Sequence, residues 1–130
     1  MPIPLLLTLG LHMAATLFWL LTSLVAGFGG NPAMSARLFR PQMVAATLAV
    51  FSGGGLWSML HPGGFRAPEM VLAAGAVLAI AAAGVQGAMV GGRVRRLPDP
   101  AAEAKVVRGQ KIAGVLLVLT LACMLIARSV

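Results

Sequence analysis

A single histidine lies inside the first apolar run of the chain, and it is the residue best suited to chemistry. No charged side chain precedes Arg37, and His12 stands eight or nine residues into this run, which corresponds to a depth of roughly 13 Å in a helix. Ionisable groups this deep in an apolar segment mark functional sites by default. A neutral imidazole offers one donor and one lone pair, which suits an iron or copper ligand. A structural hydrogen bond or a proton-transfer role are the alternatives for His12.

Other polar side chains follow the same helical faces. Steps of three and four residues join Thr8, His12, Thr16, Trp19 and Ser23 into one stripe. A second face carries Thr47, Gly54, Ser58 and His61, Gln86 is the main polar residue of the third run, and Thr120 and Cys123 lie one turn apart in the last. We expect these faces to meet in the interior of a helical bundle.

His61 and several sulfur-bearing residues extend the list of candidate ligands. His61 ends the second apolar run just before Pro62, where it is either solvated at the interface or a second ligand beside His12. Thioether and thiolate groups suit Cu(I). An alternative copper set therefore combines His12 with Met13, Met59 and Cys123, and core packing is the competing explanation for these sulfur residues.

Composition restricts the class of protein. Of the 130 residues, 59% are hydrophobic and only 10% are charged, against about 25% charged in ordinary soluble domains. This excludes a soluble globular enzyme, a disordered tail and a disulfide scaffold. The net charge of +7 lies in segments between apolar runs, which is not the pattern of a nucleic-acid-binding surface. The three acids, Glu69, Asp99 and Glu103, do not form a catalytic carboxylate pair.

Four apolar runs are long enough, or nearly so, to cross a hydrocarbon layer of about 30 Å. They predict helices at about 3–28, 42–61, 69–92 and 109–127, in one membrane domain spanning residues 1–130. Short connections favour an all-α, integral membrane four-helix bundle with up-down-up-down order. The Pro98-Asp99-Pro100 sequence is expected to interrupt any helix through the third connection. The first run lacks a basic start, so we expect it to be a helix and not a cleaved signal peptide.

The distribution of Lys and Arg predicts an orientation. Eight cations lie in the first and third connections, and only Arg66 and Arg128 lie on the opposite side. Cytoplasmic loops are enriched in Lys and Arg. We therefore expect a bacterial inner membrane protein with both termini on the non-cytoplasmic side.

Small residues indicate where the helices approach one another. Gly75, Ala79, Ala83 and Gly87 are spaced by four or a multiple of four, and Gly53, Gly54 and Gly55 form a narrow patch. Such residues allow close helix packing in membranes. The sharper alternative is that Gly54 leaves room for a cofactor.

Three segments resemble the CopD-like and HemJ-like membrane families. They are Leu11 to Trp19, with its Leu-His start and Trp end; Ala36 to Arg40 followed by Gly53-Gly54-Gly55-Leu56-Trp57; and Gly84 to Gly87 followed by Arg93 to Leu97. The likeness covers most of the chain. It departs from the HemJ-like pattern at Glu69 to Ala73, where those proteins carry a lysine, and at Gln86, where a histidine is expected.

The resemblance implies two activities. The HemJ-like family implies haem b, held by the first-helix histidine that His12 matches, with tetrapyrrole oxidation or electron transfer; His61 and Gly54 would line that site. The CopD-like family implies copper handling across the membrane. A third hypothesis is an accessory subunit of a larger membrane complex or a homo-oligomer, which needs no cofactor. Whether the chain is an enzyme stays open.

Overall fold

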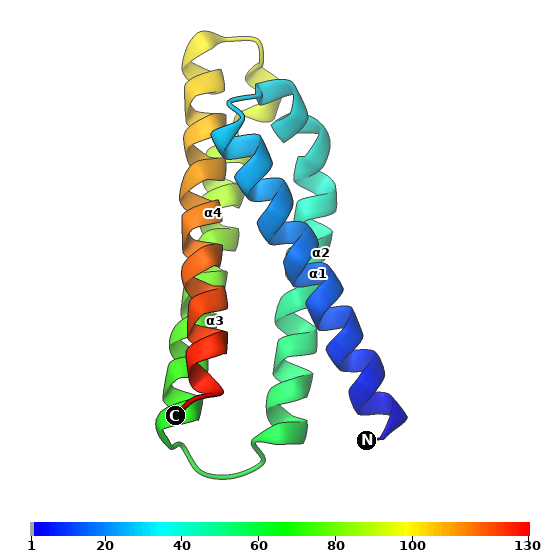
Figure 1. Ribbon diagram of the computed structural model, residues 1–130. Coiled ribbons are helices and arrows are strands. Elements are labelled where there is room, and N and C mark those ends of the chain that lie inside the picture. The colour runs from blue at the N-terminus through cyan, green and yellow to red at the C-terminus, as the bar shows by residue number, and fades with distance from the viewer. Residues whose placement is uncertain (1) are drawn as a thin grey trace.

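The computed structural model describes residues 2–130 as an all-α bundle of four long helices in up-down-up-down order (Figure 1). A π-helical turn, η1, continues α3 directly, and a short 3-10 turn, η2, precedes α4. The bounds are α1 Ile3–Phe28, α2 Pro32–Leu60, α3 Ala67–Val85, η1 Gln86–Gly91, η2 Val94–Arg96 and α4 Pro100–Ala127. Each of the four long segments is long and apolar enough to cross a membrane. The predicted fold class is therefore confirmed.

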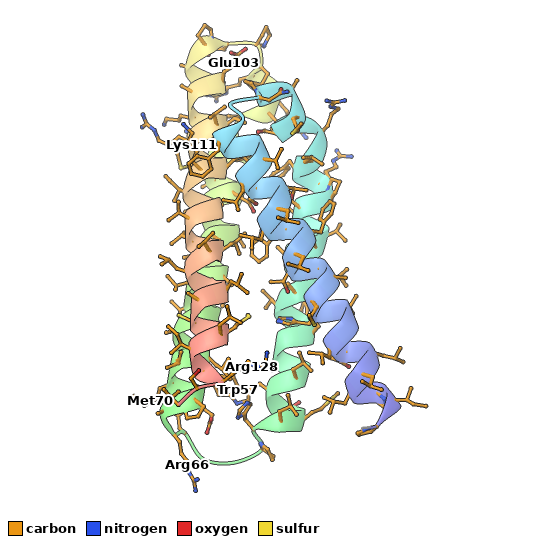
Figure 2. All side chains as sticks on the ribbon, in the orientation of Figure 1. Trp57, Arg66, Met70, Glu103, Lys111 and Arg128 are labelled. Carbon is orange, nitrogen blue, oxygen red and sulfur yellow. The ribbon has the colours of Figure 1, made fainter. Side chains whose placement is uncertain are left out.

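The connections divide between the two ends of the bundle. The α1–α2 turn and the α3–α4 connection lie at one end, and the α2–α3 loop lies at the other with both termini (Figure 1). Figure 2 shows the same division, with Glu103 and Lys111 toward the first end and Arg66, Met70 and Arg128 at the second. We call the first the basic end, because it carries the eight cations of the two connections, and the second the terminal end.

The second helix begins ten residues before its predicted start at residue 42 and includes the segment that was predicted to be a loop. Asn31 caps it by accepting a hydrogen bond from the Met34 backbone, and Pro32 occupies the first turn, where its missing N–H costs nothing. Pro41 lies inside the helix. Helices in membrane bundles tolerate internal proline because neighbouring groups satisfy the freed backbone.

The fourth helix begins at Pro100, nine residues before its predicted start at 109. Asp99 caps it by accepting from the Ala101 backbone, so the Pro98-Asp99-Pro100 break lies where the sequence predicts it. The added turns carry Lys105 and Arg108. Because these charges lower the local hydropathy, the apolar pattern alone did not predict that this segment is helical. The first helix has the predicted bounds, and α3 with η1 covers 67–91 against the predicted 69–92.

Small residues bring the helices into close contact toward the basic end. A Cβ at Gly27 of α1 would lie 2.6 Å from the backbone nitrogen of Lys111 in α4, and one at Gly114 would lie 2.9 Å from Leu24. A Cβ at Gly109 would lie 2.7 Å from Met89. Helices α1 and α4 and the η1 turn thus pack almost backbone to backbone here.

Of the small residues on α3 that were predicted to form helix contacts, only some do so. Gly75 packs against Cys123 and Thr120 of α4, and Ala79 and Ala83 pack against the core. Gly87 is exposed, with no other atom near the position of a Cβ. The buried core is instead built from residues of all four helices: Ala15, Trp19, Leu20, Ala45, Ala46, Ala49, Ala82, Ala113 and Leu117.

The terminal half of the bundle is more open. Helix α1 runs obliquely, and its N-terminal half diverges from α4 (Figure 1). Helix α2 packs mainly on α1, and α3 mainly on α4, while α2 and α3 touch each other at few positions. The cavity beside His12 lies between these two pairs and is lined by residues of all four helices.

Candidate functional site

His12 projects from α1 toward α2 and is held by two oxygen atoms of that helix. Its Nδ1 lies 3.0 Å from the Ala49 carbonyl oxygen and 3.1 Å from Ser52 Oγ. The Ser52 hydroxyl itself donates to the Leu48 carbonyl at 2.5 Å. Because both oxygens are then acceptors, the bonding assigns the proton to Nδ1 and leaves a lone pair on Nε2.

A small cavity adjoins this imidazole. Its volume is about 80 Å³, and all four helices contribute to its wall. The polar or sulfur-bearing wall residues are His12, Thr16, Trp19, Thr120 and Met124, and the others are small or aliphatic. The hydroxyls of Thr16 and Thr120 donate to the carbonyls of His12 and Leu116 in their own helices. The cavity therefore offers one imidazole and one thioether that are not committed to such a bond.

The glycine beside His12 is Gly53 and not Gly54. A Cβ at residue 53 would lie 3.1 Å from His12 Cε1, whereas Gly54 is exposed and has no atom within 4 Å of that position. The absence of a side chain at Gly53 thus allows the imidazole to approach α2 closely. Gly54 was predicted to leave room for a ligand. In the structure, Gly53 is the glycine that lies next to His12 and the cavity.

The sulfur atoms of the predicted copper set do not gather around His12. Met13 is 54% exposed and Met59 is 46% exposed, so both face away from the bundle. Cys123 packs against Gly75 and does not line the cavity. The sulfur residue that shares the cavity with His12 is Met124, one position further along α4.

His61 lies apart from His12. It caps the end of α2, where its Nδ1 is 3.2 Å from Glu69 Oε2 and its ring is tilted against Trp57. Nine residues separate it from Ser52, which corresponds to about 13 Å along a helix. The two histidines are therefore not brought to one ligand; His61 instead ties the end of α2 to the first turn of α3.

Three fully buried glutamines form a cluster that the sequence did not reveal as a group. Gln42 of α2, Gln86 at the start of η1 and Gln110 of α4 are each 0% exposed. Gln110 Nε2 donates to Gln42 Oε1 at 2.9 Å, and Gln110 Oε1 accepts from Gln86 Nε2 at 2.9 Å and from Gln42 Nε2 at 3.3 Å. We call these three residues the glutamine cluster.

Helix α1 completes the hydrogen bonding of this cluster. Trp19 Nε1 donates to Gln86 Oε1 at 2.6 Å, and Gln86 Nε2 donates to Ser23 Oγ at 2.8 Å. Gln42 Nε2 donates to Thr22 Oγ1 at 3.2 Å. Within the part of the chain that the structure describes, no buried side-chain nitrogen or oxygen lacks a partner. All four helices are joined by a closed network in which each carboxamide has its partners.

The predicted polar faces had mixed outcomes. The α1 stripe faces inward as predicted, with Trp19 and Ser23 buried and His12 and Thr16 lining the cavity. The α2 face is wrong: Thr47, Gly54 and Ser58 are exposed. The Thr47 and Ser58 hydroxyls donate to carbonyls of their own helix, so they face outward without an unsatisfied group.

The buried side of α2 consists instead of Gln42, Ala45, Ala49, Ser52 and Leu56. Their steps of three and four residues were the signal that could have located it. The same spacing joins Gln110, Ala113, Leu117 and Thr120 in α4.

The site suits a small ligand better than a macrocycle. Pockets that hold drug-sized ligands measure about 300–1,000 Å³. A porphyrin belongs to that class, and the cavity beside His12, at about 80 Å³, is smaller than this range. In residues 2–130 no three His, Cys, Asp or Glu side chains gather as a metal cluster, which leaves His12 with Met124 as the available donors.

Comparisons with protein-family models, curated proteins and solved structures find no match to this chain.

Proposed function

We propose that this chain is a membrane protein that binds Cu(I) as cargo at His12. The observation that carries the proposal is the bonding of the imidazole: Nδ1 donates to the Ala49 carbonyl, which leaves the Nε2 lone pair free on a ring that lines the cavity. Metal-bound histidines commonly use their second ring nitrogen in this way, which fixes the tautomer and the ring orientation.

The donor set favours copper over harder metals. An imidazole and a thioether are available from His12 and Met124, and no carboxylate lines the cavity. Imidazole and thioether ligands suit Cu(I), whereas Mg²⁺ and Ca²⁺ need several oxygen ligands. A cavity holds one water molecule once it offers about 10–15 Å³, so about 80 Å³ is sufficient for an ion with small companions.

The charge distribution supports an orientation for this function. The basic end would face the cytoplasm, and the termini with the α2–α3 loop would face the opposite side of a bacterial inner membrane. His12 lies in the half of α1 nearest the terminal end, so copper would reach it from the non-cytoplasmic side.

Haem b bound through His12 is the second candidate, and the oriented imidazole favours it too. Binding a macrocycle would require α2 and α3 to separate further beside Gly53, because a cavity of about 80 Å³ is too small for it. If bound, the haem would supply redox chemistry, and His12 would supply axial ligation through Nε2. The tetrapyrrole-oxidation role of the HemJ-like proteins rests on this candidate.

Replacing His12 with Ala is expected to abolish stoichiometric Cu(I) binding. The protein, purified in detergent under anaerobic conditions, is titrated with Cu(I) against a chromophoric chelator, and its absorption spectrum is recorded before and after addition of haem. We expect one Cu(I) per chain, no Soret band, and at least about tenfold weaker binding in Met124→Leu, as for loss of a metal-site partner.

Met13→Leu is the matched control, because Met13 lies in the same turn of α1 as His12 but its side chain is exposed and faces away from the cavity. It should bind copper as the unaltered protein does. Equal binding by His12→Ala would overturn the proposal. A Soret band that is present in the unaltered protein and lost in His12→Ala would favour haem binding. If the protein binds neither copper nor haem and co-purifies with a stable partner, the result would favour an accessory subunit.

A further inference from the structure

A groove at the basic end is built from α4 and the α1–α2 turn. Its volume is about 530 Å³, within the range of about 300–1,000 Å³ that holds small ligands. One wall is apolar or small, from Pro32, Pro100, Ala104 and Val107. Two cations, Arg108 and Lys111, and one acid, Glu103, also line it.

The two cations are free to bind an anion. Across residues 2–130, the His61–Glu69 pair is the one ion pair within 4.0 Å, so neither Arg108 nor Lys111 has a carboxylate partner. Both side chains are exposed. The Lys111 ammonium lies 5.9 Å from the centre of the Phe28 ring, which holds it near the end of α1. One helical turn joins the two cations on one side of α4.

The position along α4 matches the headgroup layer of a membrane. Lys111 immediately precedes the charge-free segment 112–127, so its ammonium stands where the hydrocarbon begins. Glu103 stands eight residues further out, about 12 Å along the helix (Figure 2). A ligand in the groove therefore meets two cations next to the hydrocarbon and a carboxylate farther from it.

We propose that this groove binds an anionic phospholipid with a hydroxylated headgroup, of the phosphatidylglycerol class. The phosphate would bind Arg108 and Lys111, the acyl chains would extend along the apolar bundle surface, and the headgroup hydroxyls would donate to Glu103. The surroundings favour an anion, because eight cations and two acids at this end leave a local charge of +6. A carboxylate accepts hydrogen bonds from hydroxyls, which explains an acid in an otherwise cationic groove.

Native mass spectrometry of the detergent-purified chain tests this site. The protein is mixed with equal amounts of phosphatidylglycerol and phosphatidylcholine of identical acyl chains. We expect bound phosphatidylglycerol to predominate, and the double variant Arg108→Gln/Lys111→Gln to bind it roughly thirtyfold more weakly. Glu103→Ala should reduce the preference for phosphatidylglycerol over phosphatidic acid, which lacks the hydroxyls.

The double variant Arg95→Gln/Arg96→Gln is the matched control, since it removes equal charge at the same end without altering the groove lining. It should bind phosphatidylglycerol within about threefold of the unaltered protein, because neither arginine lines the groove and exposed charges that make no direct contact are weakened by salt screening. Equal losses in both double variants would mean diffuse attraction and would overturn the proposal. A preference for phosphatidylcholine, or full displacement of the lipid by added inorganic phosphate, would also overturn it.

Discussion

Replacing Gln110 with Met is expected to destabilise the bundle by about 2–4 kcal/mol. The substitution keeps the side-chain volume nearly constant but removes the three hydrogen bonds that Gln110 makes with Gln42 and Gln86. Hydrogen bonds between membrane helices contribute about 0.6–1.7 kcal/mol each. The remaining carboxamides would also lose partners in a site with no exposed surface. Reversible unfolding in sodium dodecyl sulfate, followed by circular dichroism, measures the change.

Thr47→Ala serves as the control for this prediction. Thr47 is exposed, and its hydroxyl bonds only to the Met43 carbonyl of its own helix. We expect a change within about 0.5 kcal/mol, as for most surface positions. If Gln110→Met were no more destabilising than Thr47→Ala, the glutamine cluster would not be holding the helices together.

The substitution of Ala for glycine should have opposite effects at Gly27 and Gly54. A Cβ at residue 27 would lie 2.6 Å from Lys111 N and 2.9 Å from Gln110 C, which are backbone atoms that cannot rotate away. Overpacking of this kind costs about 1–3 kcal/mol. At residue 54 a Cβ meets nothing within 4 Å, so Ala should gain up to about 1 kcal/mol of helix propensity.

The same unfolding assay compares the two glycine variants directly. The expected difference is about 1–4 kcal/mol, with Gly27→Ala the less stable. Copper binding should be unchanged in Gly54→Ala, since this residue faces away from the cavity. Equal stability of the two variants would contradict the close approach of α1 and α4 at Gly27.

Hydropathy was sufficient to predict the number and order of the helices, because it detects apolar length. It misplaced the starts of α2 and α4, where arginine and lysine interrupt the apolar pattern. Those turns are helical because Asn31 and Asp99 cap them and Pro32 and Pro100 fill the first positions. The capping residues Asn31 and Asp99, each followed by a proline, are the sequence signal that would have predicted these helix starts correctly.

The glutamine cluster was hidden for a related reason. Gln42 and Gln110 lie close to charged residues at the ends of the predicted membrane spans. A polar side chain at such a position is expected to face water, so the sequence gives no sign that these two are buried. Only the packing of four helices shows that they meet Gln86 at one level. Similarly, the sequence identified His12 but not its partners, because Ala49 contributes a backbone carbonyl and any residue type could supply that atom.

The lengths of α2 and α4 have a consequence for the membrane in which the protein resides. At 29 and 28 residues, they extend about 43 and 42 Å, against a hydrocarbon thickness of about 30 Å. More than 10 Å of each therefore remains outside the hydrocarbon, mostly as the cation-bearing turns near Asn31 and Asp99. We expect a thicker or thinner bilayer to change how much of these turns is hydrated while leaving the helix contacts intact, so the protein should tolerate hydrophobic mismatch without tilting.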